Sequence, residues 1–479
     1  MSAEISNVRP PPDAVLAKLA DYVLTGPTGS AEAFRTARWC LLDSLGCAAL
    51  ALGHKACTKL IGPVVPGAEM KKGTPAPGTG DRLDPVRASF HIGTLIRWLD
   101  FNDTWWAGGH PSDNYSGILA AADYVSRTRV AAGKAPLVMR DVLTAAIKAY
   151  EIHGVLAEGN IFNSPETGLD LVILLKIAST AVITHLLGGG VAEVTDALSN
   201  AFVDGQPLNT YRVMPNAGPR KSWASGDATA RAMQLALLTM RGEMGYPTAI
   251  SAKTWGFSDV LYNGRPLKVT RRYGSHVIEN VQFKIAYPAQ RHSQTAAECA
   301  VRLHPLVKDR LNDIERVELT THKPALLKIV VDGPLPNFAA RDHCLQYVVA
   351  VGLIFGDITT ASYEDGFAAD PRIDRLRAQM VVREDKTYTR DYDGPRQSNH
   401  NAVQVFFKDG SRTPKVDVEF LIGDARRRKE AMPLLERKFR NNLAGRFADR
   451  QRAAVTALLT DAKRLQATPV NEFMDLLAV

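Results

Sequence analysis

The sequence predicts a mainly α-helical protein that carries a smaller α+β domain. From residue 14 to about residue 240, alanine- and leucine-rich segments place apolar side chains at three- and four-residue spacing, which is typical of helices. After Trp255 several segments alternate apolar and polar residues and are rich in Val, Ile, Phe and Tyr, which is typical of strands. Helical spacing returns from Ala431. We therefore expect a large all-helical domain, built from the N- and C-terminal parts of the chain, with an α+β domain inserted between them.

The boundaries of these parts follow from the changes in pattern. We predict a flexible N-terminal arm over residues 1–13, a first helical part over 14–274, the α+β domain over 275–420 and a second helical part over 421–479. The arm lacks the basic and then apolar pattern of a secretory signal. No apolar stretch reaches the roughly 18 residues that a membrane helix needs. We expect a cytoplasmic protein with no membrane partner.

The composition is that of an ordinary globular protein. The chain has 479 residues, of which 46% are hydrophobic and 23% are charged, and this excludes a disordered chain. Its 5 cysteines are odd in number and show no ligand spacing, so we expect neither a disulfide framework nor a zinc site. No P-loop or G-x-G-x-x-G motif follows a strand, and we predict no cofactor. The net charge of +8 is mild over this length and fits a small acidic substrate.

Individual elements follow from local patterns. Helices are predicted over residues 31–52, 118–125, 142–156 and 171–187, and several are apolar on most faces, which favours a compact bundle. The glycines at 188–190 are expected to end one of them. Strands are predicted over 277–287, 314–320, 402–407 and 415–420, and the last two are expected to form a hairpin through Lys408-Asp409-Gly410.

The densest group of chemical side chains is RWLDFNDTWWAGGHPSDN, residues 97–114. Asp100 and Thr104 are four residues apart, and the glycines before His110 let the chain fold back and bring the imidazole beside them. Carboxylate and imidazole groups together suit proton transfer. Alternatively, some of these polar residues cap helices.

Two further clusters supply cations. Arg220 and Lys221 follow Tyr211-Arg212 and Pro219 and stand just ahead of a helical segment that runs to Leu238, so they could bind a carboxylate at a helix N-terminus. Lys284 lies on a predicted strand that leads to Arg291-His292 and could face a cleft. Solvated basic residues are the alternative at each position.

Two other runs give weaker indications. The basic run at residues 424–429 is short and has no interleaved aromatic residues, so we expect no nucleic-acid binding. His343 and Cys344 could form a thiol–imidazole pair, but adjacent side chains point apart and no acyl-transfer setting accompanies them.

These clusters together resemble the MmgE/PrpD family, most closely its 2-methylcitrate dehydratase branch. The resemblance rests on segments that occur in order along nearly the whole chain: RWLDFNDTW at 97–105, HPSDN at 110–114, RKSWA at 220–224, GEMGYP at 242–247, FK at 283–284, RDHC at 341–344 with QY at 346–347, and PVNE at 469–472.

The resemblance implies a metal-independent, homodimeric lyase that has a helical domain and an α+β lid domain and removes water from a tricarboxylate, 2-methylcitrate. Asp100, Thr104, His110, Lys221 and Lys284 fall at positions that related cis-aconitate decarboxylases use in their active sites. We expect His110, oriented by Asp100, to handle one proton, with Asp100 as the rival base. The predicted catalytic residues are Asp100, His110, Lys221 and Lys284. The predicted substrate-binding residues are Thr104, Arg220, Asn114 and His292.

Two departures from the family pattern keep alternatives open. The loop from Thr104 to His110 is about two residues shorter than in the dehydratases, and Asp170 lies near the position of a family histidine that has no counterpart here. The alternatives are decarboxylation of cis-aconitate, another lyase or epimerase reaction on a related acid, and a basic helical binding protein.

Overall fold

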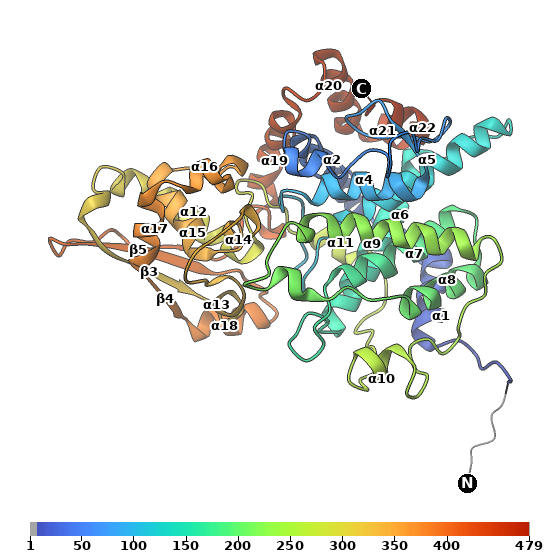
Figure 1. Ribbon diagram of the computed structural model, residues 1–479, viewed down its shortest axis with the longest axis horizontal. Coiled ribbons are helices and arrows are strands. Elements are labelled where there is room, and N and C mark those ends of the chain that lie inside the picture. Colours follow the sequence, from blue (N-terminus) through green and yellow to red (C-terminus); the bar gives the residue numbers. More distant parts are fainter. Residues whose placement is uncertain (1–6, 479) are drawn as a thin grey trace, which may run out of the picture.

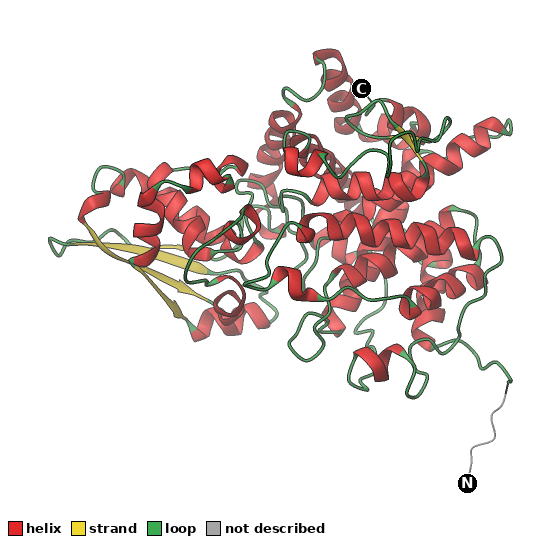
Figure 2. Ribbon diagram, viewed as in Figure 1, coloured by secondary structure: helices red, strands yellow, loops and turns green. Residues whose placement is uncertain are grey.

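The computed structural model describes residues 7–478, and this part of the chain is mostly helical with a small sheet (Figures 1 and 2). The helices of the first half are α1 (Ala14–Thr25), α2 (Ala31–Ala51), α3 (Lys55–Thr58), α4 (Pro85–Arg97), α5 (Asn114–Ala131), α6 (Met139–Gly159), α7 (Val172–Leu186), α8 (Val191–Val203), α9 (Arg220–Thr239), α10 (Phe257–Leu261) and α11 (His276–Asn280). Those of the second half are α12 (Gln294–Val307), α13 (Lys323–Ile329), α14 (Phe338–Arg341), α15 (Leu345–Phe355), α16 (Asp365–Ala368), α17 (Pro371–Ala378), α18 (Lys386–Asp393), α19 (Arg428–Leu443), α20 (Asp449–Thr460), α21 (Ala462–Ala467) and α22 (Val470–Asp475).

Two large clusters of buried apolar side chains organise the molecule. The larger cluster draws on residues 16–285 and again on residues 431–477, so the two ends of the chain share one core. The smaller cluster lies between residues 289 and 418. Figure 1 shows the corresponding helices α12 to α18 on one side of the molecule and the long helices α2, α4, α6, α7 and α9 on the other.

The part of the chain that forms the smaller cluster also contains a four-stranded sheet, in the order β4-β3-β5-β6. Its strands are β3 (Ile314–Thr321), β4 (Met380–Glu384), β5 (Asn401–Phe407) and β6 (Val416–Val418). β3 pairs parallel with β4 and antiparallel with β5, and β5 pairs antiparallel with β6, as the predicted hairpin requires. A separate two-stranded pair joins β1 (Thr74–Pro75) to β2 (Arg82–Leu83).

One predicted strand is wrong. Residues 277–287 begin inside the short helix α11 and then run extended without joining a sheet. Its strand-like pairing consists of two isolated bridges, one between Gln282 and Thr104 and one between Phe283 and Gly423. Val281, Phe283 and Ile285 nevertheless point into the larger cluster. The alternation therefore records burial of every second side chain, and burial alone does not require a neighbouring strand.

The helices α4 and α9 cross at a very short separation. A Cβ on Gly93 would lie 2.6 Å from the Cα of Gly226, and a Cβ on Gly226 would lie 2.5 Å from the carbonyl oxygen of Phe90. Only two glycines allow the backbones to approach this closely. The crossing brings the N-terminus of α9, which carries Lys221, to the same side as the chain that leaves α4.

The predicted N-terminal arm is partly described. Its residues 1–6 lie outside the described part of the chain, and residues 7–13 run over the surface without a helix. Arg9 donates a hydrogen bond to the carbonyl of Gly245, and the carboxylate of Asp13 accepts from the backbone nitrogens of Ile250 and Ser251. Among the described residues, none of the helices combines the length and the apolar character that crossing a bilayer demands.

Candidate active site

The candidate site is centred on Asp100, which lies in the loop that follows α4. Asp100 has a positive φ of 49°, and this reversal of the chain turns its side chain back toward the helix end. There the Asp100 Oδ1 accepts from Arg97 Nη1 at 2.7 Å and from Lys284 Nζ at 2.5 Å. All three side chains are buried, so the carboxylate is held between two cations away from water.

Lys284 reaches this carboxylate from the extended segment that follows α11. Gln282 forms a bridge with Thr104, and Phe283 forms a bridge with Gly423, so the segment is held against two other parts of the chain. A Cβ on Gly423 would lie 1.9 Å from the Phe283 carbonyl oxygen, so only glycine fits opposite it. Besides the carboxylate, the Lys284 ammonium also donates to the backbone carbonyl of Asp100 at 2.8 Å.

His110 lies on the other side of Asp100. Its Nδ1 is 2.6 Å from the carbonyl oxygen of Asp103, and a carbonyl only accepts, so we assign the hydrogen to Nδ1. The Nε2 of the neutral ring then carries a lone pair and lies 3.4 Å from Asp100 Oδ1. This geometry leaves the Nε2 lone pair free to accept a proton, and a proton bound there would face the Asp100 carboxylate.

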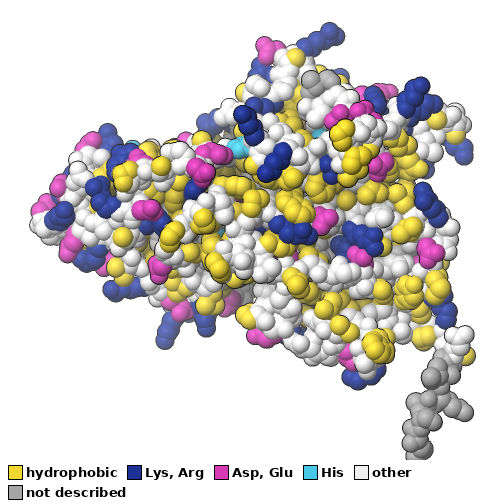
Figure 3. Space-filling view, viewed as in Figure 1, with side chains coloured by type: hydrophobic (Ala, Val, Ile, Leu, Met, Phe, Trp, Pro, Cys, Tyr) yellow, Lys and Arg dark blue, Asp and Glu magenta, His cyan; other side chains and the backbone are white. Residues whose placement is uncertain are grey.

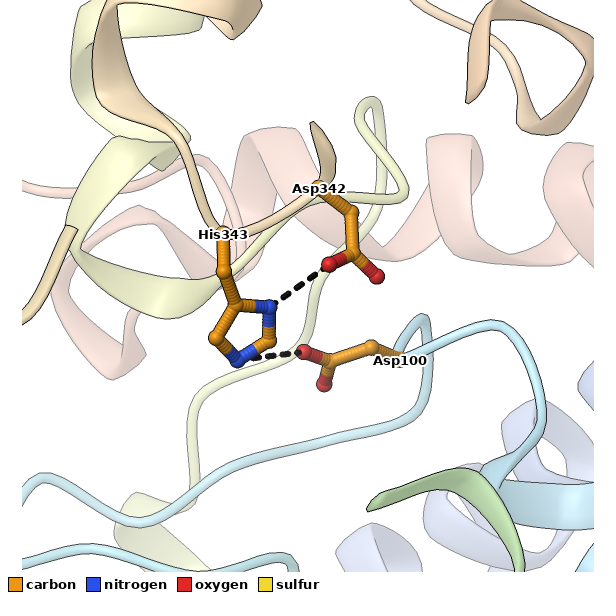
Figure 4. Close-up of side chains that lie close together, drawn as sticks. All are labelled: Asp100, Asp342 and His343. Atoms are coloured by element: carbon orange, nitrogen blue, oxygen red, sulfur yellow. Dashed lines mark hydrogen bonds and ion pairs between the residues drawn. The ribbon is translucent and has the colours of Figure 1, made fainter. Parts of the chain in front are cut away.

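A second acid–imidazole pair reaches the site from the smaller cluster. Figure 4 shows Asp342 and His343 on one loop, pointing toward Asp100 on another. His343 Nδ1 is 2.6 Å from Asp342 Oδ1, and His343 Nε2 is 4.0 Å from Asp100 Oδ2. Lys221, at the start of α9, forms an ion pair with Asp342 and lies 2.9 Å from His343 Nδ1. The site is thus built from both hydrophobic clusters.

Burial and neighbouring charges set the protonation states. Burial alone raises the pKa of Asp100, but Arg97 and Lys284 overcome this and hold that pKa well below its usual value. Burial lowers the pKa of Lys284 to about 8, although Asp100 acts in the opposite direction. Burial, reinforced by Arg97 and Lys284, also lowers the pKa of His110 far below its ordinary value. At neutral pH the site therefore holds an ionised Asp100, a protonated Lys284 and a neutral His110.

Further buried groups fix the loop that carries these residues. The Asp103 carboxylate accepts from Tyr150 Oη at 2.7 Å and from the backbone nitrogen of Ser112 at 3.1 Å. From α19, Lys438 Nζ donates to the carbonyls of Phe101 and Lys284, each at 2.7 Å, and to Asp43 Oδ1 at 2.6 Å. One ammonium group thus ties the Asp100 loop to the Lys284 segment.

The structure brings five of the eight predicted residues into this region and separates three. Asp100, His110, Lys221 and Lys284 converge, and Thr104 lies beside them with its hydroxyl donating to the Gly109 carbonyl at 3.1 Å. Three side chains have other partners: Arg220 pairs with Asp227, the Asn114 amide bonds Pro111 and Ser179, and the His292 ring packs against His322 and Tyr392. Among residues 7–478 these three side chains form no hydrogen bond or ion pair with Asp100, His110, Lys221 or Lys284, and their roles in substrate binding stay predictions.

Three members of the site were not predicted from the sequence as site residues. Arg97 is the first residue of the cluster at residues 97–114 but was not singled out. His343 was considered only as a partner of Cys344, which instead packs in the smaller cluster, and its partner Asp342 was passed over. The available signal was the local sequence Asp342-His343, an acid directly beside an imidazole.

Asp100, Asp342 and His343 offer ligand atoms within 4.8 Å of one another, which is a spacing also seen around metal ions. In this site the ammonium groups of Lys284 and Lys221 already pair with the two carboxylates. The chain itself therefore supplies the compensating positive charge. Such a site can accept a proton at His110 and stabilise a carboxylate whose negative charge grows.

Comparison with known proteins assigns both parts of the chain. Residues 17–270 match the MmgE/PrpD N-terminal domain and residues 287–462 match the MmgE/PrpD C-terminal domain. The chain is 53% identical to a 2-methylcitrate dehydratase of Cupriavidus necator over 99% of both chains. It is 50% identical to a 2-methylcitrate dehydratase of Escherichia coli strain K12 over the whole of both chains. It is 46% identical to a mitochondrial 2-methylcitrate dehydratase of Yarrowia lipolytica, over 98% of this chain and 91% of the relative.

Proposed function

The chain belongs to the MmgE/PrpD family, and from this premise we propose that it is a 2-methylcitrate dehydratase, a hydro-lyase that converts 2-methylcitrate to 2-methyl-cis-aconitate. The similarity to dehydratases of this name over the full chain carries the proposal. The reaction serves propionate breakdown in the methylcitrate cycle. It agrees with a site that pairs one neutral base with several buried cations.

The reaction needs two proton transfers. A proton leaves the carbon beside one carboxylate, the hydroxyl leaves the adjacent carbon, and a double bond forms between the two carbons. His110 Nε2 is the base that accepts the carbon-bound proton, since its lone pair faces the site and the imidazolium would be stabilised by Asp100. The departing hydroxyl takes a second proton and leaves as water.

Lys284 is the acid in this scheme, because a pKa of about 8 makes its ammonium a better proton donor than an ordinary lysine. Lys221 stabilises the carboxylate that gains charge when the carbon-bound proton leaves. Thr104 hydrogen-bonds the substrate from the neighbouring loop. Asp342 and His343 close the site from the opposite side.

The same premise extends to the architecture. The larger cluster forms an interrupted helical domain, and the smaller cluster forms an α+β lid over the site. The enzyme acts as a homodimer in the cytoplasm. Size-exclusion chromatography with light scattering tests the dimer, because a mass near the 52.2 kDa of one chain would contradict it.

The decisive experiment is an ultraviolet assay for the unsaturated product, with chelator-treated protein and 2-methylcitrate as substrate. Citrate and cis-aconitate are run in parallel, and carbon dioxide release is measured with cis-aconitate. We expect product from 2-methylcitrate in the presence of chelator. Carbon dioxide from cis-aconitate without dehydration of 2-methylcitrate would replace the proposal with a decarboxylase, and inactivity on all three acids would refute the substrate.

A further inference from the structure

Arg212 lies beside the site, and only two of the three nitrogen atoms of its guanidinium hydrogen-bond to other described residues of the protein. Its Nε forms an ion pair with Asp170 Oδ2, and its Nη2 donates to Asp170 Oδ1 at 3.3 Å. Among residues 7–478, no partner is found for the remaining nitrogen, Nη1. The side chain is 18% exposed, and the Nε edge of its guanidinium is held by Asp170.

The clamp is rigid because Asp170 is itself fixed. Asp170 is fully buried, and its Oδ1 also accepts from the backbone nitrogen of Val172 at the start of α7 at 2.9 Å. Its own backbone nitrogen donates to the Pro207 carbonyl at 2.9 Å. A guanidinium held along one edge in this way presents the other edge in a fixed orientation, and this lowers the entropy lost when a ligand binds.

The surrounding contacts place Arg212 next to the candidate active site. Its neighbour Tyr211 packs against Ala224 and Ala228 of α9, the helix that begins with Arg220 and Lys221. On the other side, Leu171 follows Asp170, and its Cδ1 would lie 2.8 Å from a Cβ on Gly108, in the loop that carries His110. The charge of Asp100 reaches Arg212 as well. Burial lowers the Arg212 pKa, but the opposing effects of Asp170 chiefly, and of Asp100 with it, are larger, so the pKa is raised overall.

Each of the site's other cations already forms an ion pair with a carboxylate of the protein, and two of them share one carboxylate. Lys221 pairs with Asp342, and both Lys284 and Arg97 pair with Asp100. The proposed substrate carries three carboxylates, and it needs a cation that can still offer hydrogen bonds without breaking an internal pair. The free edge of Arg212 meets this need, because a guanidinium matches the geometry of a carboxylate.

We propose that Arg212 is a specificity-determining residue that binds one carboxylate of the tricarboxylate substrate through its free edge, with Asp170 as its positioning partner. This inference rests on the proposed function for the identity of the substrate. It assigns Arg212 a role in binding and leaves the proton transfers to His110 and Lys284.

The test compares ligands as well as variants. Tricarballylate, which has three carboxylates and no hydroxyl to eliminate, is titrated by calorimetry against wild type, Arg212→Gln and Arg212→Lys. Glutarate and methylsuccinate, which each lack one of its carboxylates, are titrated in parallel. Arg231→Gln is the matched control, because Arg231 is also a partly exposed arginine that pairs with a single aspartate, Asp204.

In wild type we expect tricarballylate to bind more tightly than either dicarboxylate. In Arg212→Gln its Kd should rise roughly 10- to 100-fold, as for the loss of a charged hydrogen bond. The Kd of the dicarboxylate that lacks the Arg212-bound group should stay unchanged. Arg212→Lys should give an intermediate Kd for tricarballylate, because lysine keeps the positive charge but cannot donate two parallel hydrogen bonds to one carboxylate. Arg231→Gln should match wild type.

The outcomes separate the two proposals. Equal weakening of all three ligands in Arg212→Gln and Arg212→Lys indicates a structural role and overturns the inference, as does unchanged binding of tricarballylate. A wild type that shows no preference for the tricarboxylate also overturns it. If the selective loss occurs but the wild-type protein fails to dehydrate 2-methylcitrate, Arg212 remains a carboxylate-binding residue and only the proposed reaction fails.

Discussion

At the scale of single residues, the site works by shifting the protonation of ordinary side chains. Burial removes the charge from His110 and lowers the pKa of Lys284 to about 8, whereas Arg97 and Lys284 keep Asp100 ionised. The proposed base, a neutral imidazole, and the proposed acid, an ammonium that donates its proton more readily than an ordinary lysine, are thereby held around one carboxylate. Groups with pKa values driven in different directions are the usual means by which a protein obtains acid and base at the same pH.

The assignment of the base predicts the effect of His110→Asn. We expect kcat for 2-methylcitrate to fall by roughly 10²- to 10⁴-fold, because the asparagine amide cannot take up the carbon-bound proton. Initial rates of product formation measure this. His185→Asn, at the exposed end of α7, is the control and should retain wild-type rates. Near wild-type turnover in His110→Asn would show that another group removes the proton.

The assignment of the acid predicts the pH profile. Lys284 must be protonated, so kcat/KM should fall above pH 8, by about tenfold for each further pH unit. Since the His110 pKa lies far below its ordinary value, the plateau should extend below pH 6.5. In Asp100→Asn the alkaline limb should shift to lower pH, because removing a negative charge lowers the Lys284 pKa further. An unmoved limb would exclude Lys284 as its origin.

At the scale of elements, the geometry of the site depends on a few close approaches of backbone. The crossing of α4 and α9 through Gly93 and Gly226 sets where Lys221 stands relative to Asp100. Lys438 from α19 then joins the Asp100 loop to the Lys284 segment. The catalytic side chains are therefore positioned by helices that carry none of the proposed proton transfers.

The α4–α9 crossing predicts a loss of stability in Gly93→Ala. Alanine favours a helix by up to about 1 kcal/mol over glycine, but here its Cβ would lie 2.6 Å from backbone that cannot rotate away. We expect a net loss of roughly 1–3 kcal/mol in the free energy of unfolding by urea. In the matched control, Gly366→Ala in α16, the new Cβ meets nothing within 4 Å, so a small gain is expected. Equal stability of the two variants would contradict the tight crossing.

At the scale of the whole molecule, the site lies where the two hydrophobic clusters meet. Asp342 and His343 come from the smaller cluster's side, and both contact Lys221. His343 also lies beside Asp100 (Figure 4). Elsewhere, on the face drawn in Figure 3, basic side chains are scattered among acidic ones. The lid proposed above would have to separate from the helical part to admit the substrate and close again over it.

This arrangement predicts a change in overall dimensions on ligand binding. The proposed lid movement predicts that the free protein scatters X-rays as a particle more extended than the structure described above. Saturating tricarballylate should bring the radius of gyration down to the value calculated from the structure. Lys221→Gln, which removes the ion pair with Asp342, should weaken this closure. A free protein that already matches the structure and does not respond to ligand would refute lid movement.

The sequence by itself determined the local features of this protein. Helical spacing located the long helices, such as α2 at Ala31–Ala51, and apolar alternation located β3 and β5, because both patterns depend on neighbours within one segment. Residues 97–114 marked the site because Asp100, Thr104 and His110 are close along the chain. The resemblance to a family connected Lys221 and Lys284 to them.

Only the tertiary structure decided which distant groups meet. It placed residues 281–285 as an extended segment in the core, assembled Asp342 and His343 with Asp100, and directed Asn114 and His292 to other partners. The physical reason is that a side chain's pattern in the sequence reports whether it is buried, whereas its partner and its pKa depend on charges that the fold brings from hundreds of residues away.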